Sequence, residues 1–443
     1  MTPPFPEAWR RERPTPSLPE AHRTVGVRAH PAPPWRKFFS FVGPGFMVAV
    51  GYMDPGNWAT DLAGGSQYGY ALLSVILLSS LMAMLLQHLC VKLGVATGRD
   101  LAQSCRDHYP KPVAWFLFVL CEIAIAACDL AEVVGSAIGL QLLFGIPLFW
   151  GCAITALDVL AILFLQHKGF RWLEALVIVL IGTIGACFAV EMWYAKPSLT
   201  GMLLGLTPPP ALLYDRQMLY VAIGILGATV MPHNLYLHSS IVQTRDYPRT
   251  PEGRREAIKF STLDSNIALT LAFFINAAIL VLAATAFHQG HPEVAEIQDA
   301  YKLLDGALGV GFASILFAVA LLASGQNSTL TGTLAGQIVV QGFLNLKMPA
   351  WLSRLMTRAL AIVPALFVIG VYGEKQTTNL LVASQVCLSL QLGFAVWPLM
   401  RFTSDRAKMG EFVNPPWIKA LGWTVTLTII GLNLKFLADW VRG

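Results

Sequence analysis

The sequence predicts an all-α polytopic membrane protein with eleven transmembrane helices. Three observations support this fold class: the composition, the length of the apolar runs, and two runs that a proline interrupts. The chain has 443 residues, of which 55% are hydrophobic and 13% are charged, whereas soluble proteins carry about 25% charged residues. Several runs reach the roughly 20 apolar residues that a helix needs to cross a bilayer. A helical bundle fits such runs, whereas a β-barrel would show short alternating segments.

The order of segments begins with a polar stretch. Residues 1–36 are rich in Pro and Arg and have no apolar period, so we expect a disordered cytoplasmic tail and not a signal peptide. Residues 37–437 are expected to form a single transmembrane domain. Its predicted spans are residues 38–64, 68–94, 112–135, 147–166, 172–193, 217–243, 260–287, 307–327, 356–373, 378–401 and 416–437.

Basic residues test this count independently of hydropathy. If the N-terminus is cytoplasmic, 25 of the 31 Lys and Arg residues fall on the cytoplasmic side. Cytoplasmic loops of membrane proteins carry such an excess. We therefore predict a cytoplasmic N-terminus and an extracytoplasmic C-terminus.

The seven cysteines are odd in number, lie mostly inside apolar runs and have no CxxC spacing. We interpret them as buried packing residues and not as a disulfide framework or a thiolate metal site. We expect no cofactor and no nucleic-acid partner, and we expect the chain to act as a monomer in the lipid bilayer.

Two spans are interrupted at corresponding points. Asp54-Pro55-Gly56-Asn57 lies in the first span and Met231-Pro232-His233-Asn234 lies in the sixth. Aligning the two stretches places Pro55 on Pro232, Asp54 on Met231, and Gly51 on Ala228. Two hydrophobic segments broken at matching points of two halves indicate the binding site of a transporter.

The spacing of the breaks also predicts the architecture. The broken spans are numbers one and six, so residues 38–193 and 217–401 can form two repeats of five spans, inverted because five is odd. Residues 416–437 are then an additional helix. Inverted repeats with broken helices place the substrate near the bilayer midplane.

The residues at the breaks predict a site for a cation. Freed carbonyls near residues 51 and 228 point the negative end of a helix dipole at the ion, and Asp54 adds a full charge. The Met231 thioether is a soft ligand, poor for Ca²⁺ or Mg²⁺ and acceptable to Mn²⁺, Fe²⁺ or Co²⁺, while Asp54 and Asn57 supply hard oxygens. The alternative is that Met231 only fills the core.

Span ten contains further polar groups in an apolar run, Gln385 and Gln391. Interhelical hydrogen bonds are one account of them. Because span ten closes the second repeat, a glutamine there can instead complete the shell of the ion, and Gln385 is the better candidate.

Acidic residues in the membrane predict a path for protons. Asp54 can couple metal binding to proton release, because a bound cation displaces the proton of a ligand. In span three, Glu122, Asp129 and Glu132 lie on one helical face. With Arg354 or His233 as partners they would relay protons. The alternative is a static network of buried salt bridges.

The two histidines of span six have different expected roles. His233 adjoins the break, so we expect a gating or proton-linked role for it. His238 lies five residues further and cannot share a metal ion with His233 on a regular helix. We interpret His238 as a residue of the proton path.

These residues carry a resemblance to the Nramp (natural resistance-associated macrophage protein) family, in its bacterial MntH-like branch. Residues 54–57 resemble the DPGN motif of its first helix, and residues 231–234 resemble the MPHN motif of its sixth. Residues 325–337, placed between spans eight and nine, are similar to its transport signature. The resemblance covers roughly residues 38–437. The chain differs from the family pattern at Gly51, Asn327 and Gly393, where Ala, Ser and Pro are usual, and Gly393 bears on whether span ten bends.

The resemblance implies a LeuT-like fold and proton-coupled uptake of divalent transition metals by alternating access across a bacterial plasma (inner) membrane. It implies Asp54, Asn57 and Met231 as side-chain ligands, with the carbonyls of Gly51 and Ala228. It also implies roles for Asp129, Glu132 and Arg354 in proton movement. It implies no enzymatic activity and therefore no catalytic residue.

Three other functions compete with this interpretation. A sodium-coupled amino-acid symporter of the same fold would not place Asp54 where a substrate carboxylate must bind. An intramembrane aspartyl protease needs two aspartates around one water, but Met231 occupies the aligned position. A metal channel without proton coupling would contain the same selectivity residues, and the sequence leaves it open.

Overall fold

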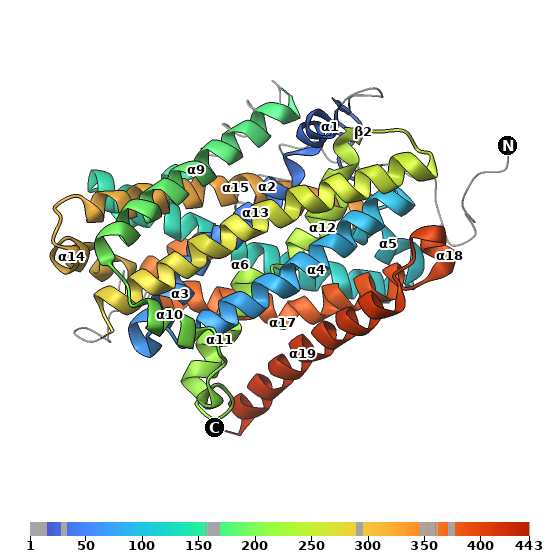
Figure 1. Cartoon of the computed structure of the whole chain (residues 1–443). Helices are drawn as coiled ribbons and strands as arrows, with labels where there is room; N and C mark the ends of the chain where they lie inside the picture. Colours follow the sequence, from blue (N-terminus) through green and yellow to red (C-terminus); the bar gives the residue numbers. More distant parts are fainter. Residues whose placement is uncertain are drawn as a thin grey trace.

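A computed structural model of the chain describes residues 16–27, 33–155, 169–288, 296–345, 362–370 and 377–442, and the single positions 157, 352 and 359. These residues form a bundle of helices (Figure 1). The first half contains α1 (Pro34–Phe41), α2 (Pro44–Val50), the 3₁₀ turn η2 (Gly51–Met53), α3 (Pro55–Tyr68), α4 (Leu73–Thr97), α5 (Leu101–His108), α6 (Lys111–Phe144), α7 (Leu148–Thr155), α9 (Phe170–Ala195), α10 (Leu199–Gly205) and η3 (Pro210–Leu213).

The second half continues the bundle. It contains α11 (Arg216–Thr229), α12 (Pro232–Ile241), η4 (Val242–Thr244), α13 (Pro251–Ala286), α14 (Ile297–Leu308), α15 (Ala313–Leu344), α17 (Thr377–Thr403), α18 (Arg406–Met409), η6 (Gly410–Phe412) and α19 (Pro416–Val441).

The predicted all-α membrane fold is confirmed. Among the described residues, eight helical segments are long and apolar enough to cross a membrane: α4, α6, α9, α11 with α12, α13, α15, α17 and α19. The first predicted span is the broken run α1 to α3. The predicted spans 147–166 and 356–373 fall partly outside the described residues.

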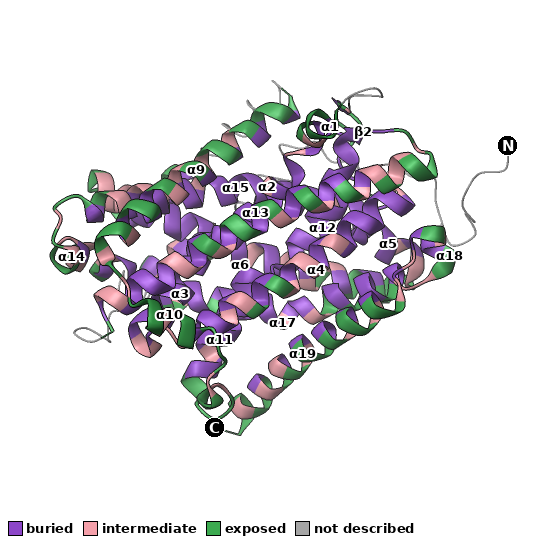
Figure 2. Cartoon of the chain, viewed as in Figure 1, coloured by how far each residue is buried: buried purple, intermediate pink, exposed green. Residues whose placement is uncertain are grey.

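Helices in the middle of the bundle carry the breaks, and peripheral helices face outward. All ten residues of α12 are buried, and Figure 2 shows buried residues along α3, α11 and α12. By contrast α9 and α19 expose large apolar side chains such as Trp172 and Trp417. Such side chains suit a surface in contact with lipid. The candidate ion site is therefore enclosed by protein.

The predicted position of the transport signature is wrong. Residues 325–337 do not lie between helices but inside α15. Their hydroxyl groups bond back to carbonyls of the same helix, as in Thr329 to Gly325 at 2.9 Å and Thr333 to Thr329 at 2.7 Å. Polar side chains satisfied in this way are tolerated within a membrane helix. Hydropathy alone ends the span too early.

The small residues of α15 allow α6 to approach closely. A Cβ placed on Gly332 would lie 2.8 Å from Oδ1 of Asp129 and 2.9 Å from Oε1 of Glu132, and one on Gly325 would overlap the Ser136 hydroxyl. Small residues at helix interfaces in membranes permit such contacts. Asp129 and Glu132 of α6 therefore face α15, the helix that carries the signature.

The predicted disorder of residues 1–36 is wrong for residues 16–27, and also for Pro34–Arg36, which begin α1. Val25–Gly26 (β1) pairs in parallel with Arg245–Asp246 (β2), directly after η4. The Ser17 hydroxyl donates to Asp100, and the Gln337 amide donates to Glu20 at 2.6 Å. These long-range polar contacts hold the segment although it has no apolar period. We call residues 16–27 the N-terminal strap.

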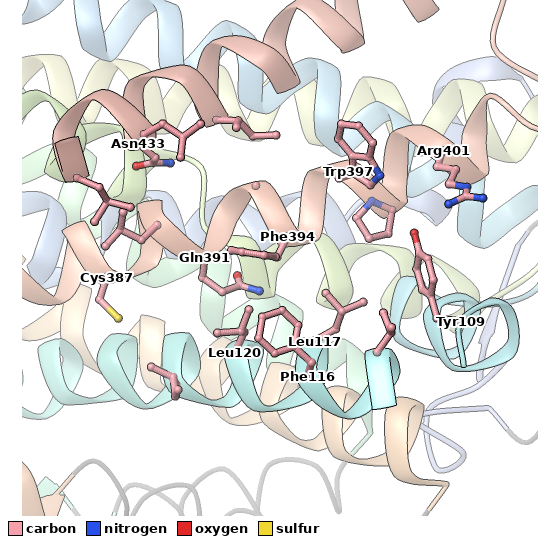
Figure 3. Close-up of a pocket in the computed structure, with 18 residues that line it drawn as sticks. Tyr109, Phe116, Leu117, Leu120, Cys387, Gln391, Phe394, Trp397, Arg401 and Asn433 are labelled. Carbon is pink, nitrogen blue, oxygen red and sulfur yellow. The ribbon is translucent and has the colours of Figure 1, made fainter. Parts of the chain in front are cut away.

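Span ten is one continuous helix. α17 passes through Gly393 without interruption. A Cβ on Gly393 would lie 3.1 Å from Cγ1 of Ile430 in α19, so the glycine allows the two helices to pack closely. Beside this contact, a groove of about 670 Å³ lies between α6, α17 and α19 (Figure 3). Gln391 lies in this groove.

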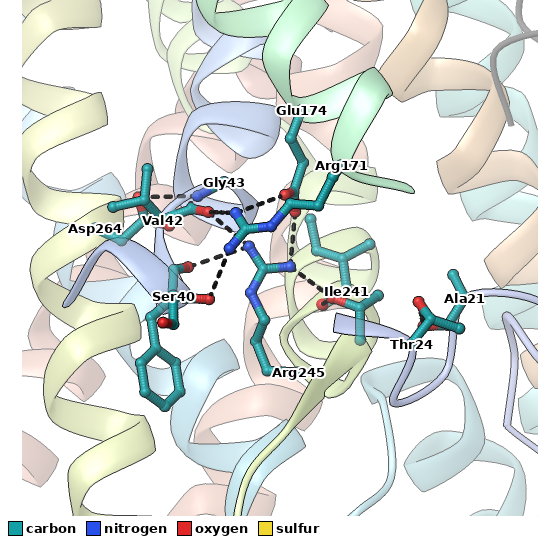
Figure 4. Close-up of polar contacts among 12 residues, drawn as sticks. Ala21, Thr24, Ser40, Val42, Gly43, Arg171, Glu174, Ile241, Arg245 and Asp264 are labelled. Carbon is teal, nitrogen blue, oxygen red and sulfur yellow. Dashed lines mark hydrogen bonds and ion pairs between the residues drawn. The ribbon is translucent and has the colours of Figure 1, made fainter. Parts of the chain in front are cut away.

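The junction between α1 and α2 is held by a cluster of charged residues, drawn in Figure 4. Arg245 contacts Glu174 at 2.7 Å and donates to the Val42 carbonyl at 2.7 Å. Arg171 donates to the same carbonyl at 2.7 Å. Asp264 accepts from the backbone N–H of Gly45 at 2.7 Å. We call Arg171, Glu174, Arg245 and Asp264 the junction cluster.

Candidate functional site

The first break has the geometry of a helix start. Asp54 has an extended backbone, with φ −69° and ψ 166°, and is the N-cap of α3. Its Oδ1 accepts from the backbone N–H of Asn57 at 2.8 Å. A capping carboxylate satisfies an otherwise unpaired N–H. Asp54 therefore stays ordered at the break and keeps Oδ2 for other contacts.

The second break repeats this geometry without the acid. Met231 is the N-cap residue of α12, with φ −71° and ψ 126°, and Pro232 begins the helix. Its side chain is fully buried. A Cβ placed on Gly51 would lie 3.2 Å from Sδ of Met231. The two predicted breaks therefore meet in space.

Both breaks deprive a carbonyl of its helical partner. In an α-helix the carbonyl of residue 51 would accept from the N–H of residue 55, and that of residue 228 from the N–H of residue 232. Both donors are replaced by prolines, Pro55 and Pro232, which have no N–H. Gly51 and Ala228 thus lack this bond, at the positions where the sequence predicts carbonyl ligands.

Amide side chains complete the surroundings of the break. Asn57 Oδ1 and Gln385 Oε1 are buried and have no hydrogen-bond partner among the described residues. A Cβ on Gly56 would overlap the Gln385 amide, so this side chain of α17 lies against the first turn of α3. Buried amide oxygens without partners are costly unless a ligand fills them. The structure thus brings Gln385 to the break, whereas Gln391 lies in the groove.

The acids of α6 divide into two positions. Asp129 and Glu132 are almost fully buried and face Gly332 of α15, while Glu122 is half-buried nearer the start of α6. The sulfur of Cys128 lies 3.6 Å from Oε1 of Glu132. The predicted partner Arg354 lies outside the described residues.

The two histidines are both buried, in different surroundings. His238 Nδ1 lies 2.9 Å from Oε1 of Gln87, and Gln87 donates to the Tyr52 hydroxyl at 2.8 Å. This chain connects α12, α4 and η2, and it ends two residues before Asp54. His233 lies in the first turn of α12, and its Nδ1 has no partner among the described residues.

Sequence reasoning missed two residues near the break. Cys128 was interpreted as packing, yet its sulfur lies 3.7 Å from Oδ2 of Asp54; no local sequence signal predicts that contact. Asp61 is buried within α3, and its Oδ2 has no partner among the described residues. An acid within a predicted span was the signal that could have identified Asp61.

The candidate donors are chemically mixed. Within the described part of the chain, no three His, Cys, Asp or Glu side chains are grouped so that they could hold a metal ion. The donors around the breaks are instead a carboxylate, two amides, a thioether and two carbonyls, from Asp54, Asn57, Gln385, Met231, Gly51 and Ala228. Such a set suits a divalent cation with both hard and soft character.

Comparisons with known proteins agree with this geometry. The family model described as natural resistance-associated macrophage protein-like matches residues 45–439. The chain belongs to the Nramp family. The divalent metal cation transporter MntH of Nostoc sp. is 63% identical over 429 residues, covering 97% of both chains. That of Listeria innocua is 57% identical over 432 residues, covering 97% of this Nramp chain and 96% of the relative.

Solved structures support the fold of this Nramp protein. The manganese transporter of Eremococcus coleocola matches with a TM-score of 0.87 and 40% identity, covering 96% of this chain and 90% of that one. Mhp1, a nucleobase-cation-symport-1 family transporter, matches with a TM-score of 0.60 at 13% identity, covering 90% of this chain and 91% of that one. The latter likeness concerns the fold alone. The predicted LeuT-like architecture is therefore confirmed, and the relatives are named as transporters, not enzymes.

Proposed function

We propose that this Nramp protein imports divalent transition-metal ions, Mn²⁺ and also Fe²⁺ and Co²⁺, in symport with protons. The relatives named as divalent metal cation and manganese transporters support the substrate class. The observation that carries the proposal is the meeting of the two breaks, which sets the Asp54 carboxylate and the Met231 thioether in one buried region. Hard oxygen and soft sulfur together favour late first-row ions over Ca²⁺ and Mg²⁺.

The burial of the site supports alternating access. The side chains of Asp54, Asn57 and Met231 have at most 1% of their surface exposed. A continuously open channel would leave its ligands in contact with water. The site must therefore open by a conformational change, and broken helices in inverted repeats provide hinges for such a movement.

The proton route in this proposal starts at Asp54 and continues along α6. The Cys128 sulfur lies 3.7 Å from Oδ2 of Asp54 and 3.6 Å from Oε1 of Glu132. Cys128 therefore links the ion site to Glu132 of α6. Metal that binds Asp54 displaces its proton, and Glu132 and Asp129 receive it, with Arg354 as the proposed charge partner. Glu122, His233 and His238 are the further candidates on this route.

The remaining parts of the proposal concern the setting of the transporter. The chain acts as a monomer without a cofactor in a bacterial inner membrane, with its N-terminus in the cytoplasm and its C-terminus outside. The excess of basic residues on one side supports this orientation.

Uptake by purified protein in proteoliposomes tests the proposal. The parent protein should take up Mn²⁺ and acidify the lumen, and Asp54→Asn should reduce uptake about 100-fold, as loss of a metal ligand would. The control is Asp299→Asn, which removes an exposed acid of α14 that pairs with Lys302 and should leave uptake unchanged. Equal uptake by the parent and Asp54→Asn would refute the site.

Coupling requires a separate measurement. Asp129→Asn should retain Mn²⁺ entry but weaken the accompanying acidification, because it removes a proton acceptor and not a ligand. Mn²⁺ entry into parent proteoliposomes with no proton movement would instead support an uncoupled channel.

A further inference from the structure

Cys128 differs from the other cysteines in its surroundings. It lies on α6 with 2% of its surface exposed, and its sulfur is 3.7 Å from Oδ2 of Asp54. It belongs to a small apolar cluster with Met231, Ala124 and Leu388. Its thiol is therefore close to both residues that carry the hard and soft character of the proposed ion site.

The separation of the sulfur and the carboxylate oxygen fits a shared ion. A thiolate binds a divalent ion at about 2.3 Å and a carboxylate at about 2.1 Å, so at a tetrahedral angle the two donors lie about 3.6 Å apart. The structure has 3.7 Å between Cys128 Sγ and Asp54 Oδ2. In the structure the thiol donates a hydrogen bond to the carboxylate across this distance, and an ion that both donors bind would take the place of that proton.

Independent features at the same break also call for a ligand. The amide oxygens of Asn57 and Gln385 are buried and have no partner among the described residues, and the Gln385 amide is aimed at the first turn of α3. These oxygens belong to different helices from Cys128. An ion bound at this break would give both oxygens a partner.

We propose that Cys128 is a second sulfur ligand that extends the site to softer divalent ions such as Cd²⁺ and Zn²⁺. This proposal rests on the proposed function, since it concerns the same site. Thiolate is a softer donor than thioether and carboxylate, so it strengthens binding of soft ions more than that of Mn²⁺. Coordination replaces the thiol proton.

Co²⁺ titration of the purified full-length protein provides a direct test. A cobalt–thiolate bond gives a charge-transfer absorption in the near ultraviolet, which a hydrogen bond from the thiol does not. We expect this band in the parent and in Cys121→Ala, a buried cysteine on the same helix. We expect it to be absent in Cys128→Ser and Cys128→Ala. A band that persists in both Cys128 variants would overturn the proposal.

Calorimetric titration then separates a ligand from a hydrogen-bond donor. Cys128→Ser keeps a donor of similar size, so it should weaken Cd²⁺ binding at least about tenfold and change Mn²⁺ binding less than about twofold. If Cys128→Ser weakened the binding of Cd²⁺ and Mn²⁺ equally, Cys128 would act only through Asp54, against the proposal. Cys128→Ala should show the same Cd²⁺ loss, and its thermal transition checks that it is folded.

The outcomes also distinguish this inference from the proposed function. A parent protein that binds Mn²⁺ while the Cys128 variants keep full Cd²⁺ affinity would refute the role of Cys128 alone. A parent protein that binds neither Mn²⁺ nor Cd²⁺ would refute the ion site itself.

Discussion

The first span is interrupted twice, and the two interruptions use their polar groups differently. Between α1 and α2, the Val42 carbonyl accepts from two arginines, and the N–H of Gly45 is taken by Asp264. At the second interruption, between η2 and α3, the Gly51 carbonyl lacks its helical donor because residue 55 is a proline. The Asn57 amide oxygen has no partner among the described residues.

This difference separates a structural interruption from a binding one. Unpaired polar groups in a membrane interior are costly. At a break that only redirects the chain, protein side chains therefore bond to the free backbone groups, as those of the junction cluster do. A break that binds an ion must leave donors for it. Substitutions in the first should therefore affect stability, and those in the second should affect binding.

The largest expected effect is that of Arg245→Ala. Among the described residues, it leaves the buried Glu174 with only the half-exposed Arg171 as its ion-pair partner. Breaking a buried pair costs about 3–5 kcal/mol. Chemical denaturation in detergent should show this loss in the free energy of unfolding, while the folded fraction should bind Mn²⁺ like the parent.

Arg171→Ala is the matched control for that experiment. Arg171 donates to the same Val42 carbonyl but is about half-exposed, so its loss should cost about 1 kcal/mol or less. If both variants lost the same stability, burial of Arg245 would not be the cause. If Arg245→Ala abolished Mn²⁺ binding by folded protein, the distinction between the two interruptions would be lost.

The same distinction explains what the sequence could predict. The broken helices were predictable because proline and an acid inside an apolar run are local signals, and their match 177 residues apart, between Asp54 and Met231, points to repeats. A glutamine of span ten was predictable as a candidate ligand because that span closes the second repeat. The fold class followed from composition and run length.

The wrong predictions have a common physical origin. Each involves polar groups whose partners lie far away in the sequence or within the same helix. Thr329 and Thr333 lowered the hydropathy of α15, although their hydroxyls are satisfied within the helix. Ser17 and Glu20 looked like part of a disordered tail because their partners lie 83 and 317 residues away. The contact of Cys128 with Asp54 depends on how α6 packs, which no local pattern encodes.

The hydrogen bonds that link His238, Gln87 and Tyr52 near the ion site test whether polar groups beside the binding interruption serve structure or transport. In Gln87→Leu, the Tyr52 hydroxyl and Nδ1 of His238 lose their shared partner. Burying polar groups without partners costs about 1–3 kcal/mol each, so we expect reduced stability with unchanged Mn²⁺ affinity. Leu86→Ala, a buried truncation one residue earlier, is the control for a nonspecific core effect on uptake. If Gln87→Leu lost proton-coupled uptake and Leu86→Ala did not, the hydrogen bonds from His238 through Gln87 to Tyr52 would belong to the transport path instead.

The smallest expected effect in free energy concerns the selectivity of the break. Met231→Ala removes the thioether but leaves Asp54, Asn57 and the backbone in place, so Mn²⁺ uptake should fall about tenfold and not disappear. Ca²⁺ and Mg²⁺, which the parent should reject, should then compete with Mn²⁺, because most of the donors that remain for Mn²⁺ are hard oxygens. Met400→Ala truncates an equally buried methionine of α17 that packs near Gly422, and it should leave rejection of Ca²⁺ intact. Unchanged rejection of Ca²⁺ by Met231→Ala would mean that the Met231 sulfur only fills space and does not contribute to the selection of the ion.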